Sequence, residues 1–373
     1  MILHFLSDDK FSDYVINQFS GPEMCSEFVL VSESDTTKHF QNLDKTKRVN
    51  PCSDGEMNYL ISMLNNYSAI VLHGLFFPWC ETILRNVPDN VKVAWVFWGG
   101  EIYGRKDLKY SFLLPRTKAV SLAKDFKDWL CGKKNNIYEL PKELFHRVDY
   151  CLTDMQEEFE FARQYINSSN LKHIWYNYYS VDETVGELMN RQAFGDGVFV
   201  GNSCTVECNY FDVFWKLSRL LKDNKRVVVP LGYGSPWLKK RVMDYGKKSF
   251  GSRFTPLIDF LPLEDYNKIL LSCSTMIQPQ RRNQAQGNVI TGLWLGMKVY
   301  LSERNFAYPY FKRLGMNVFT VEHDLNDEGQ DPFAPLSQQE INYNRKVLLK
   351  WYKWEVMKEK NLKMVELLEA RCC

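Results

Sequence analysis

Short apolar runs alternate with longer amphipathic segments along the whole chain. They form two series, the first at 1–6, 27–32, 68–74, 91–100, 148–154 and 172–179, the second at 197–203, 225–234, 254–262, 275–280, 297–302 and 317–322. Nearly continuous apolar strands separated by helical segments are typical of parallel sheets covered by helices on both faces. The pattern therefore predicts an α/β protein with two doubly wound domains.

The expected boundary between the domains is the polar segment 181–197, which contains Gly195 and Gly197. We expect an N-terminal domain at 1–185, a C-terminal domain at 186–336 and a helical tail at 337–373. A chain of 373 residues agrees with this division, because a single hydrophobic core stops growing at roughly 250–300 residues.

The tail from Ser337 has an apolar side and a basic side. Between 340 and 363 it carries seven Lys or Arg residues against three acidic ones. Its apolar side contains Leu348, Leu349, Trp351, Tyr352 and Trp354. We expect the tail to pack back across the two domains with a solvated basic face; the alternative is contact with an anionic membrane surface.

Composition and charge exclude several classes of protein. The net charge of +2 gives no overall attraction to nucleic acid. The aromatic content of 14% suits clefts that hold rings or sugars, although core packing also uses aromatic residues. The ten cysteines, which include Cys25, Cys52, Cys80 and the Cys372–Cys373 pair, form no CxxC pair and have no matching His cluster. We therefore expect reduced structural thiols rather than a zinc site or a disulfide framework.

The first residues, MILHFLSDDKFSDY, contain no basic leader. Their apolar run is interrupted by His4 and ended by Asp8, well short of the ~7–15 residues of a signal core. No window approaches the ~20 uninterrupted apolar residues of a membrane span. We expect a cytosolic protein.

The segment 278–296, QPQRRNQAQGNVITGLWLG, places many hydrogen-bond donors before an apolar helix. Its guanidinium groups can form charge-assisted, bidentate bonds to phosphate oxygens, its amides donate further hydrogen bonds, and its glycine lets the backbone approach closely. The dipole of the following helix attracts the same anion. The segment fits a diphosphate site or, alternatively, a polar linker with solvated arginines; the candidate residues are Gln280, Arg281, Arg282, Gln284, Gly287 and Asn288.

Two further strands of the second series end in glycine-containing turns, VFVGNSCT and PLGYGSPW. Ligands of open α/β sheets bind outside the carboxyl ends of the strands, where helix N-termini present free N–H groups to anions. Ser203 or Thr205 has the alternative role of capping the next helix. The candidate ligand-binding residues of these turns are Gly201, Asn202, Ser203, Gly232, Tyr233 and Gly234.

Several motifs of the sequence together are similar to those of a known family. GNS, LGYG, LPLEDYNKILLSC, RNQAQGN and LGMKVYLSE occur in this order over 195–305, and HFLSDD and FWGGEIYG extend the likeness into the N-terminal half. The ensemble resembles the bacterial TDP-N-acetylfucosamine:lipid II N-acetylfucosaminyltransferases (glycosyltransferase family 56), which act in the assembly of enterobacterial common antigen and related surface polysaccharides such as O-antigen. The family pattern Arg-Gln-Gln-Ala-x-Gly-Asn has Asn283 in place of its first Gln and is matched by Arg282, Gln284, Ala285, Gly287 and Asn288.

The resemblance implies a GT-B fold, with two Rossmann-like domains facing across a cleft. The C-terminal domain would hold the nucleotide sugar and the N-terminal domain the acceptor. No metal is required, because arginines and helix N-termini can neutralise the leaving diphosphate, and the chain shows no clear DxD motif. Glu264 and Glu303 lie where a carboxylate could hold ribose hydroxyls, although each equally fits a helix-start or surface charge.

Transfer to a hydroxyl acceptor commonly uses a carboxylate or a histidine as general base. Glu101, which follows the strand VAWVFWGG, is the first candidate. His73 and Asp8, with its neighbour Asp9, also end strands of the first series. The alternative for each is a structural hydrogen bond at the strand exit. An enzyme that retains the anomeric configuration needs no such base.

The segment 103–134 mixes nine Lys or Arg residues with apolar residues. It fits docking on anionic lipid or contact with the diphosphate of a lipid-linked acceptor; the alternative is an ordinary amphipathic helix pair. Its apolar members are Phe112, Leu113, Leu114 and Trp129.

Together with these features, the resemblance implies a metal-independent hexosyltransferase at the cytoplasmic face of the bacterial inner membrane. The resemblance implies transfer of an N-acetylfucosamine-like deoxyamino sugar from a TDP donor to a polyprenyl-diphosphate-linked oligosaccharide. One alternative is a GT-B transferase that uses a UDP- or GDP-sugar on another glycan, and another is a non-catalytic nucleotide-sugar-binding module. A Rossmann oxidoreductase is disfavoured because no GxGxxG motif opens a βα unit.

Overall fold

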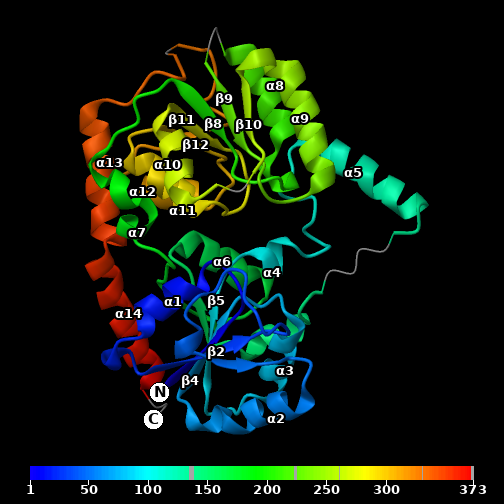
Figure 1. Ribbon diagram of the computed structural model, residues 1–373, viewed down its shortest axis with the longest axis vertical. Helices are drawn as coiled ribbons and strands as arrows, with labels where there is room; N and C mark the ends of the chain where they lie inside the picture. Colours follow the sequence, from blue (N-terminus) through cyan, green and yellow to red (C-terminus); the bar gives the residue numbers. More distant parts are fainter. Residues whose placement is uncertain (134–137, 222–224, 260, 330, 371–373) are drawn as a thin grey trace. The chain divides into compact units, whose positions relative to one another are not determined.

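The structure is a computed structural model that describes residues 1–133, 138–221, 225–259, 261–329 and 331–370 (Figure 1). Two compact units make up the chain. Unit 1 comprises Met1–Lys106, Asn136–Ser180 and Trp354–Cys373, and unit 2 comprises Asp107–Asn135 and Val181–Lys353. Three segments thus depart from the expected ranges: 107–135 and 181–185 belong to unit 2, and the tail is shared between the units. Lys134 and the Cys372–Cys373 pair lie outside the described residues.

Within the described residues, unit 1 contains a seven-stranded sheet in the order β3-β2-β1-β4-β5-β6-β7. Every neighbouring pair of strands is parallel. β1 and β4 are buried along their whole length, which agrees with helices on both faces of the sheet. The strands are β1 (Ile2–Leu6), β2 (Ser26–Val31), β3 (Lys47–Val49), β4 (Ala69–His73), β5 (Lys92–Val96), β6 (Tyr150–Leu152) and β7 (Lys172–Ile174).

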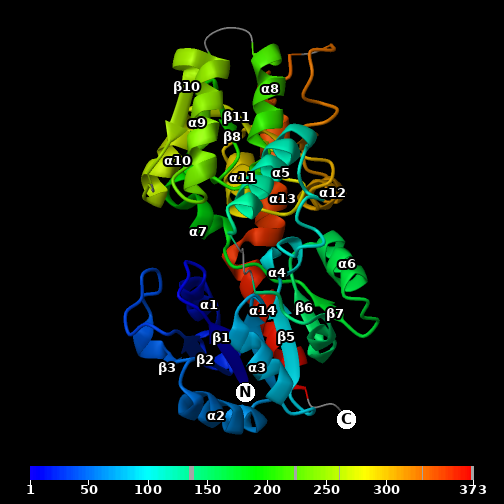
Figure 2. The same ribbon diagram turned by 90° about the vertical axis from the view of Figure 1, so that its right-hand side faces the viewer.

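The helices of unit 1 cover this sheet with apolar faces. One core cluster joins Leu6 of β1, Phe19 of the first helix and Val71 of β4. The last helix adds Met364 and Leu368 to the same cluster and contacts β1 (Figure 2). The helices are α1 (Ser12–Phe19), α2 (Asp54–Met63), α3 (Pro78–Asn86), α4 (Gly100–Tyr103), α6 (Gln156–Tyr165) and α14 (Trp354–Glu369).

Unit 2 contains, in its described part, a six-stranded sheet in the order β10-β9-β8-β11-β12-β13, with all neighbours parallel. Its strands are β8 (Gly197–Val200), β9 (Val227–Pro230), β10 (Phe254–Leu257), β11 (Cys273–Gln278), β12 (Lys298–Leu301) and β13 (Phe319–Thr320). In both sheets the chain forms a central strand first, adds strands toward one edge, and then returns to the centre and adds the remaining strands on the other side. This strand order is that of doubly wound nucleotide-binding folds, so the fold class expected from the sequence is confirmed.

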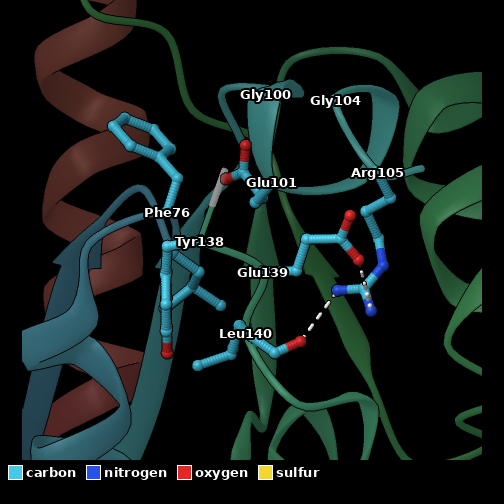
Figure 3. Close-up of a pocket in the computed structure, with 9 residues that line it drawn as sticks. Phe76, Gly100, Glu101, Gly104, Arg105, Tyr138, Glu139 and Leu140 are labelled. Atoms are coloured by element: carbon cyan, nitrogen blue, oxygen red, sulfur yellow. Dashed lines mark hydrogen bonds and ion pairs between the residues drawn. The ribbon is translucent and has the colours of Figure 1, made fainter. Parts of the chain in front are cut away.

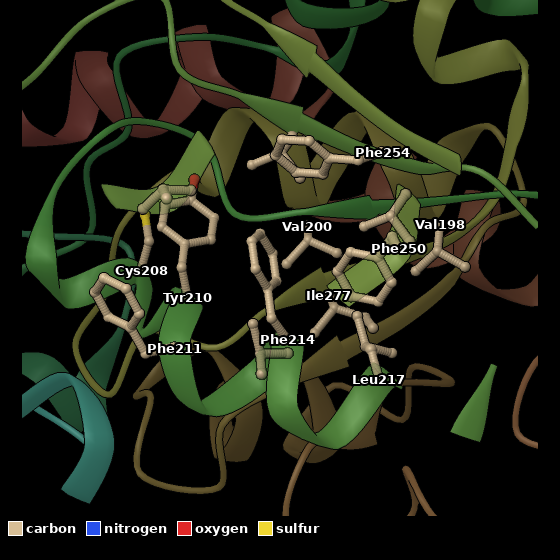
Figure 4. Close-up of a cluster of buried hydrophobic side chains, with 14 of the residues drawn as sticks. Val198, Val200, Cys208, Tyr210, Phe211, Phe214, Leu217, Phe250, Phe254 and Ile277 are labelled. Carbon is tan, nitrogen blue, oxygen red and sulfur yellow. The ribbon is translucent and has the colours of Figure 1, made fainter. Parts of the chain in front are cut away.

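The helices of unit 2 bury aromatic side chains against its sheet. In α8, Tyr210, Val213, Phe214 and Leu217 follow the spacing of one helical face and are buried. Figure 4 shows Phe214 among residues of β8, β11 and α9. The helices are α5 (Pro115–Leu130), α7 (Val181–Val185), α8 (Tyr210–Leu220), α9 (Pro236–Phe250), α10 (Leu263–Leu271), α11 (Gln286–Trp294), α12 (Ala307–Arg313) and α13 (Gln338–Tyr352).

The tail forms two helices rather than one. Ser337 begins α13 with a capping box, in which its side chain accepts from the N–H of Glu340 and the Glu340 carboxylate accepts from the N–H of Ser337. Lys353 adopts an extended conformation and ends this helix. α13 contacts α11 and α7 in unit 2, whereas α14 contacts α1 and β1 in unit 1. Leu348 and Tyr352 are fully buried, as their place on the apolar side predicts.

Each apolar run of the sequence overlaps one strand of the structure. The additional strand, β3, was missed because its three residues, KRV, include two charged ones and are too few to show a pattern. Among the helices that the structure describes, none is long and apolar enough to cross a membrane.

Replacing Phe214 by Ala should destabilise the protein strongly. Phe214 is fully buried, so the substitution leaves a cavity and should lower the free energy of unfolding by about 3–5 kcal/mol. The same substitution at Phe194, whose side chain is 75% exposed, should change it by less than about 0.5 kcal/mol. Urea denaturation measures both values, and a similar loss for the two variants would contradict the assigned core.

Candidate active site

The candidate donor site lies at the topological switch point of unit 2. β8 and β11 are neighbours in the sheet, and the chain turns in opposite directions after each of them. The glycine turn 201–203 follows β8, and the polar segment 279–285 follows β11. Doubly wound folds bind ligands in the crevice at this place. Two of the motifs proposed from the sequence thus lie on adjacent strand ends.

Two glycines are required for the close approach of these turns. Gly201 has a φ of +72°, and a Cβ there would lie 2.5 Å from the hydroxyl of Tyr210. Gly234 has a φ of +115°, and a Cβ there would lie 2.3 Å from the backbone oxygen of Cys204. The turn after β9, which also contains Gly232, is therefore held against the turn after β8 by backbone contact.

A network of side-chain amides joins the two strand ends. The Oδ1 atom of Asn202 accepts hydrogen bonds from Nε2 of Gln280 at 3.0 Å and from Nε2 of Gln284 at 3.1 Å. The Nδ2 atom of Asn202 donates to the hydroxyl of Tyr233 at 3.3 Å. Gln284 also donates to the Ser203 hydroxyl at 3.2 Å. Five residues proposed from the sequence are therefore brought together in one network.

The hydroxyls of Ser203 and Thr205 serve this network rather than a helix cap. Gln284 Nε2 lies 3.3 Å from Thr205 Oγ1. The next helix, α8, starts after Asn209 and has no side-chain cap. The alternative that Ser203 or Thr205 caps that helix is thus excluded by its N-terminal geometry.

Three supporting residues were not identified as site residues from the sequence. Gln278 is fully buried, and its Nε2 donates to the carbonyl of Gly201 at 3.1 Å while its Oε1 accepts from Gln280. Asn305 holds the carbonyls of Gln280 and Arg282 at 3.0 and 2.9 Å. Asn209 donates to the carbonyl of Pro279 at 3.2 Å. The available signal was position: Gln278 ends a strand, and Asn305 follows one.

The helix α11 starts beside this network with an open N-terminus. Its N-cap residue, Ala285, has a φ of +61°, and no side chain caps the helix. Gly287 and Asn288 lie in its first turn, where unsatisfied N–H groups and the helix dipole favour an anion. Asn288 Nδ2 donates to the hydroxyl of Tyr266 at 2.7 Å. The predicted helix is thus present and begins one residue earlier than expected, at Gln286.

Two arginines add positive charge to the same strand end. Arg281 and Arg282 are both partly buried, and the side chain of Arg282 is 16% exposed. Burial lowers the pKa of Arg281, with a further contribution from the charge of Arg304. A guanidinium nevertheless stays charged at neutral pH. Nη2 of Arg282 lies 3.9 Å from Oε1 of Glu207.

Two predicted carboxylates have local partners outside the network. Glu264 is exposed in the first turn of α10, where its Oε1 lies 2.6 Å from Nζ of Lys268. Glu303 is exposed after β12, and its Oε2 lies 2.8 Å from Nε2 of His323. The roles of Glu264 and Glu303 at a ribose stay predictions.

In unit 1, Glu101 is buried at the end of β5. It lies in the first turn of α4, and the residue is 4% exposed. Its Oε1 accepts from Nε1 of Trp95 at 2.7 Å and from the N–H of Trp98 at 3.2 Å. Burial raises the pKa of Glu101 to about 7, against the opposing effect of these donors. A carboxyl with this pKa can accept or release a proton near neutral pH.

Glu101 lines a pocket within unit 1 (Figure 3). The volume of the pocket is about 230 Å³. Arg105 is fixed beside it, with Nη1 donating to the carbonyl of Leu140 at 2.8 Å and Nη2 lying 3.5 Å from Oε2 of Glu139. The carboxyl of Glu101 thus shares the pocket with aromatic and charged groups. The lining residues are Leu75, Phe76, Gly100, Glu101, Gly104, Arg105, Tyr138, Glu139 and Leu140.

His73 lies in a buried chain of hydrogen bonds. Its Nε2 is 3.2 Å from Nδ1 of His4, and its Nδ1 is 3.0 Å from the hydroxyl of Tyr178. Burial lowers the pKa of His73 well below its ordinary value, and the neighbouring His4 adds to this effect. Both ring nitrogens are engaged, which favours the structural alternative for His73.

Asp8 and Asp9 organise the loop after β1. Asp8 accepts from the N–H groups of Lys38, His39 and Phe40 at 2.8, 2.9 and 3.1 Å. Burial acts to raise the pKa of Asp8, but these three donors outweigh it and lower the pKa. Asp9 accepts from the N–H of Phe11 at 2.6 Å, and burial raises its pKa. The contacts of Asp8 fit a structural role.

No protein-family profile matches the chain, and no curated protein matches it by sequence. Several solved structures match it. A glycosyltransferase from Rickettsia africae has a TM-score of 0.65 at 10% identity and covers 98% of both chains. Anabaena Alr3699/HepE, in complex with UDP and glucose, has a TM-score of 0.55 at 10% identity, with 99% of this chain and 96% of that chain covered.

The lipopolysaccharide outer core galactosyltransferase WaaB is a third similar structure. Its TM-score is 0.55 at 12% identity, with 99% of this chain and 100% of that chain covered. Identities this low establish the fold and nothing finer. The chain therefore has the GT-B fold of two Rossmann-like units, as the sequence predicted.

Replacing Glu101 by Gln should flatten the dependence of stability on pH. Between its ordinary pKa of 4.5 and its folded pKa of about 7, Glu101 keeps its proton in the folded chain and loses it in the unfolded chain. The unfolded state thus binds fewer protons, and wild-type stability falls as pH rises through this window, by roughly 3 kcal/mol from this group.

Urea denaturation at about pH 5 and about pH 8 measures this difference. The Glu101→Gln variant should lose less stability between the two pH values than wild type does. Glu143→Gln, at an exposed carboxyl of unit 1, is the matched control and should follow wild type. Identical pH dependence of wild type and Glu101→Gln would contradict the raised pKa.

Proposed function

We propose that the protein is a glycosyltransferase that binds a nucleotide sugar at the switch point of unit 2 and uses Glu101 of unit 1 as its general base. The observation that carries this proposal is the amide network of Asn202, Gln280 and Gln284 next to an uncapped helix and two arginines. The GT-B fold supports it, because the solved structures that cover nearly the whole chain include glycosyltransferases.

The donor is held through its diphosphate. The N–H groups at the start of α11 and the guanidinium groups of Arg281 and Arg282 provide positive charge where the leaving group becomes more anionic. Hydrogen bonds to a charged group are worth about 1.5–3 kcal/mol each. We propose that these hydrogen-bond donors stabilise the leaving nucleoside diphosphate and that the reaction requires no metal ion.

The acceptor is activated by the second oxygen of Glu101. Oε1 is occupied by the Trp95 and Trp98 donors, whereas Oε2 is buried and makes no hydrogen bond of ordinary geometry among the described residues. The acceptor hydroxyl gives its proton to Oε2 while its oxygen bonds to the anomeric carbon. The bond between that carbon and the diphosphate oxygen breaks, and the nucleoside diphosphate leaves. This single displacement inverts the anomeric configuration.

The finer assignment is a TDP-linked, N-acetylfucosamine-like donor and a polyprenyl-diphosphate-linked acceptor. It is supported by the motif residues of the resemblance, because Arg282, Gln284, Gly287 and Asn288 all lie in the candidate donor site. We propose that the protein acts at the cytoplasmic face of the bacterial inner membrane, where such acceptors are exposed. HepE was solved with UDP, so a UDP-sugar is the second candidate donor.

Replacing Arg282 by Ala should weaken binding of a nucleoside diphosphate. Loss of one charge-assisted contact corresponds to about 1.5–3 kcal/mol, or roughly a tenfold to hundredfold rise in Kd. Calorimetric titration with TDP, UDP and GDP, without metal and then with magnesium, measures the change and also ranks the nucleotides. Arg241→Ala, at an exposed position of α9, is the matched control and should leave Kd unchanged.

The titrations separate the alternatives. Tightest binding of TDP supports the deoxyamino-sugar donor, and tightest binding of UDP or GDP moves the donor assignment while keeping the site. Equal affinity of wild type and Arg282→Ala would remove Arg282 from the diphosphate site. Tight binding without any sugar transfer would favour a nucleotide-sugar-binding module.

Replacing Glu101 by Gln should suppress transfer while leaving nucleotide binding intact. Loss of a general base typically lowers kcat by about 10²–10⁴-fold. Because Glu101 must be deprotonated to act, the wild-type kcat should rise with pH and level off above about 7. A coupled assay of nucleoside diphosphate release gives the profile. Transfer at the wild-type rate by Glu101→Gln, or a profile without this limb, would exclude the base role.

A further inference from the structure

The helix α5 displays an apolar face to solvent. Phe126, Trp129 and Leu130 are 62%, 71% and 64% exposed, and Leu122 is 45% exposed. Their spacing of four, seven and eight residues from Leu122 places all four on one side of a helix. The rings of Phe126 and Trp129 also stack, with centroids 5.9 Å apart. We call these four residues the α5 face.

The opposite side of α5 is fixed to unit 2. The Asp212 carboxylate of α8 accepts from the N–H groups of Arg116 and Thr117 at 2.9 and 2.8 Å, and so caps the helix from a neighbouring element. Val120 packs against the core of unit 2, and Thr117 is buried. The α5 face is therefore presented by a helix that is anchored by one side.

The surroundings of the α5 face are basic. Lys118 and Lys127 are exposed and, by helical spacing, lie on either flank of the face. Both acids of the helix form ion pairs with lysines. Asp125 lies 2.6 Å from Lys109, and Asp128 pairs with Lys124 one turn earlier. Positive charge thus dominates the border of the apolar surface.

The helix α9 extends this positive surface. It contains five Lys or Arg residues and one acidic residue. Lys124 of α5 and Arg241 of α9 both lie over the ring of Trp237, at 5.5 and 4.9 Å from its centroid, so the two helices are neighbours there. Figure 2 shows α5 beside the α8 and α9 helices.

We propose that the α5 face, flanked by Lys118 and Lys127, is the surface by which the protein docks on an anionic lipid bilayer. This inference rests on the proposed function, because a lipid-linked acceptor requires access to a membrane. Aromatic and aliphatic side chains enter the boundary of headgroups and acyl chains, while the lysines contact anionic headgroups. A second copy of the chain is a poorer occupant, because a symmetric contact would bring like charges together.

The apolar residues of the tail do not offer a comparable surface. Leu348 and Tyr352 of α13 are fully buried, and Met364 and Leu368 of α14 belong to the core of unit 1. The tail thus fits the packed alternative, and the α5 segment is the better candidate for membrane contact.

Sedimentation with vesicles tests the proposal. Wild type is mixed with vesicles of phosphatidylcholine alone and with vesicles that also contain phosphatidylglycerol. Wild type should bind the anionic vesicles, and Phe126→Ser with Trp129→Ser should lower the partition coefficient by more than about tenfold. Lys118→Gln with Lys127→Gln should lower it by about tenfold or more, but only for anionic vesicles.

The matched control is Phe194→Ser with Tyr343→Ser, which removes two exposed rings elsewhere in unit 2. It should bind vesicles like wild type. Binding of TDP or UDP without vesicles, measured on every variant, reports a folded donor site. Weaker vesicle binding with unchanged nucleotide affinity supports the proposal. If wild type itself binds neither TDP nor UDP, the proposed function is wrong, whatever the vesicle results are.

Three outcomes overturn the proposal. The first is that the double variant Phe126→Ser with Trp129→Ser binds anionic vesicles as tightly as wild type does. The second is equal binding of wild type to neutral and anionic vesicles. The third is no vesicle binding together with self-association that Phe126→Ser with Trp129→Ser abolishes, which would identify the α5 face as a contact between copies of the chain.

Discussion

The side-chain oxygen of Asn202 is the hydrogen-bonding centre on which the candidate donor site depends. It accepts from Gln280 and Gln284, and so ties the segment after β11 to the turn after β8. A buried polar group that lost its partner would cost about 1–3 kcal/mol, so the two strand ends hold each other in place. The positions of the arginines and of the open helix N-terminus next to Gln284 are consequently fixed. Selective binding of a diphosphate requires groups that are fixed in this way.

Burial has a different consequence at Glu101 than at Asn202. Asn202 is buried with its acceptor satisfied, whereas the buried Glu101 has hydrogen bonds of ordinary geometry on one oxygen only, among the described residues. Burial raises its pKa to about 7, which lowers the stability of the folded chain near neutral pH. A cost of this kind is expected at functional sites, where a poised proton acceptor is worth more than maximal stability. The contrast with the engaged nitrogens of His73 is the physical reason to prefer Glu101 as the base.

The sequence predicted those features that follow from strand periodicity. Parallel strands end at one edge, so Gly201, Asn202 and Gln284 were expected near one another and are found so. Glu264 and Glu303 were assigned by position alone, and nothing local revealed their partners Lys268 and His323. Asn209 and Asn305 were missed as site residues because a single polar residue carries no pattern; their role arises from carbonyls far away in the chain.

The same limit explains why two amphipathic segments with similar sequence patterns have different fates. Both the tail and 103–134 mix aromatic residues with lysines, and periodicity alone could not tell which apolar side is covered. In α13, Tyr352 is buried, with its hydroxyl 3.0 Å from that of Tyr310, so unit 2 itself supplies the partner. In α5, the helix is anchored to unit 2 through Asp212, Thr117 and Val120, and Phe126 and Trp129 stay exposed. Tertiary anchoring therefore decides which apolar stripe belongs to the core and which is left to meet another surface.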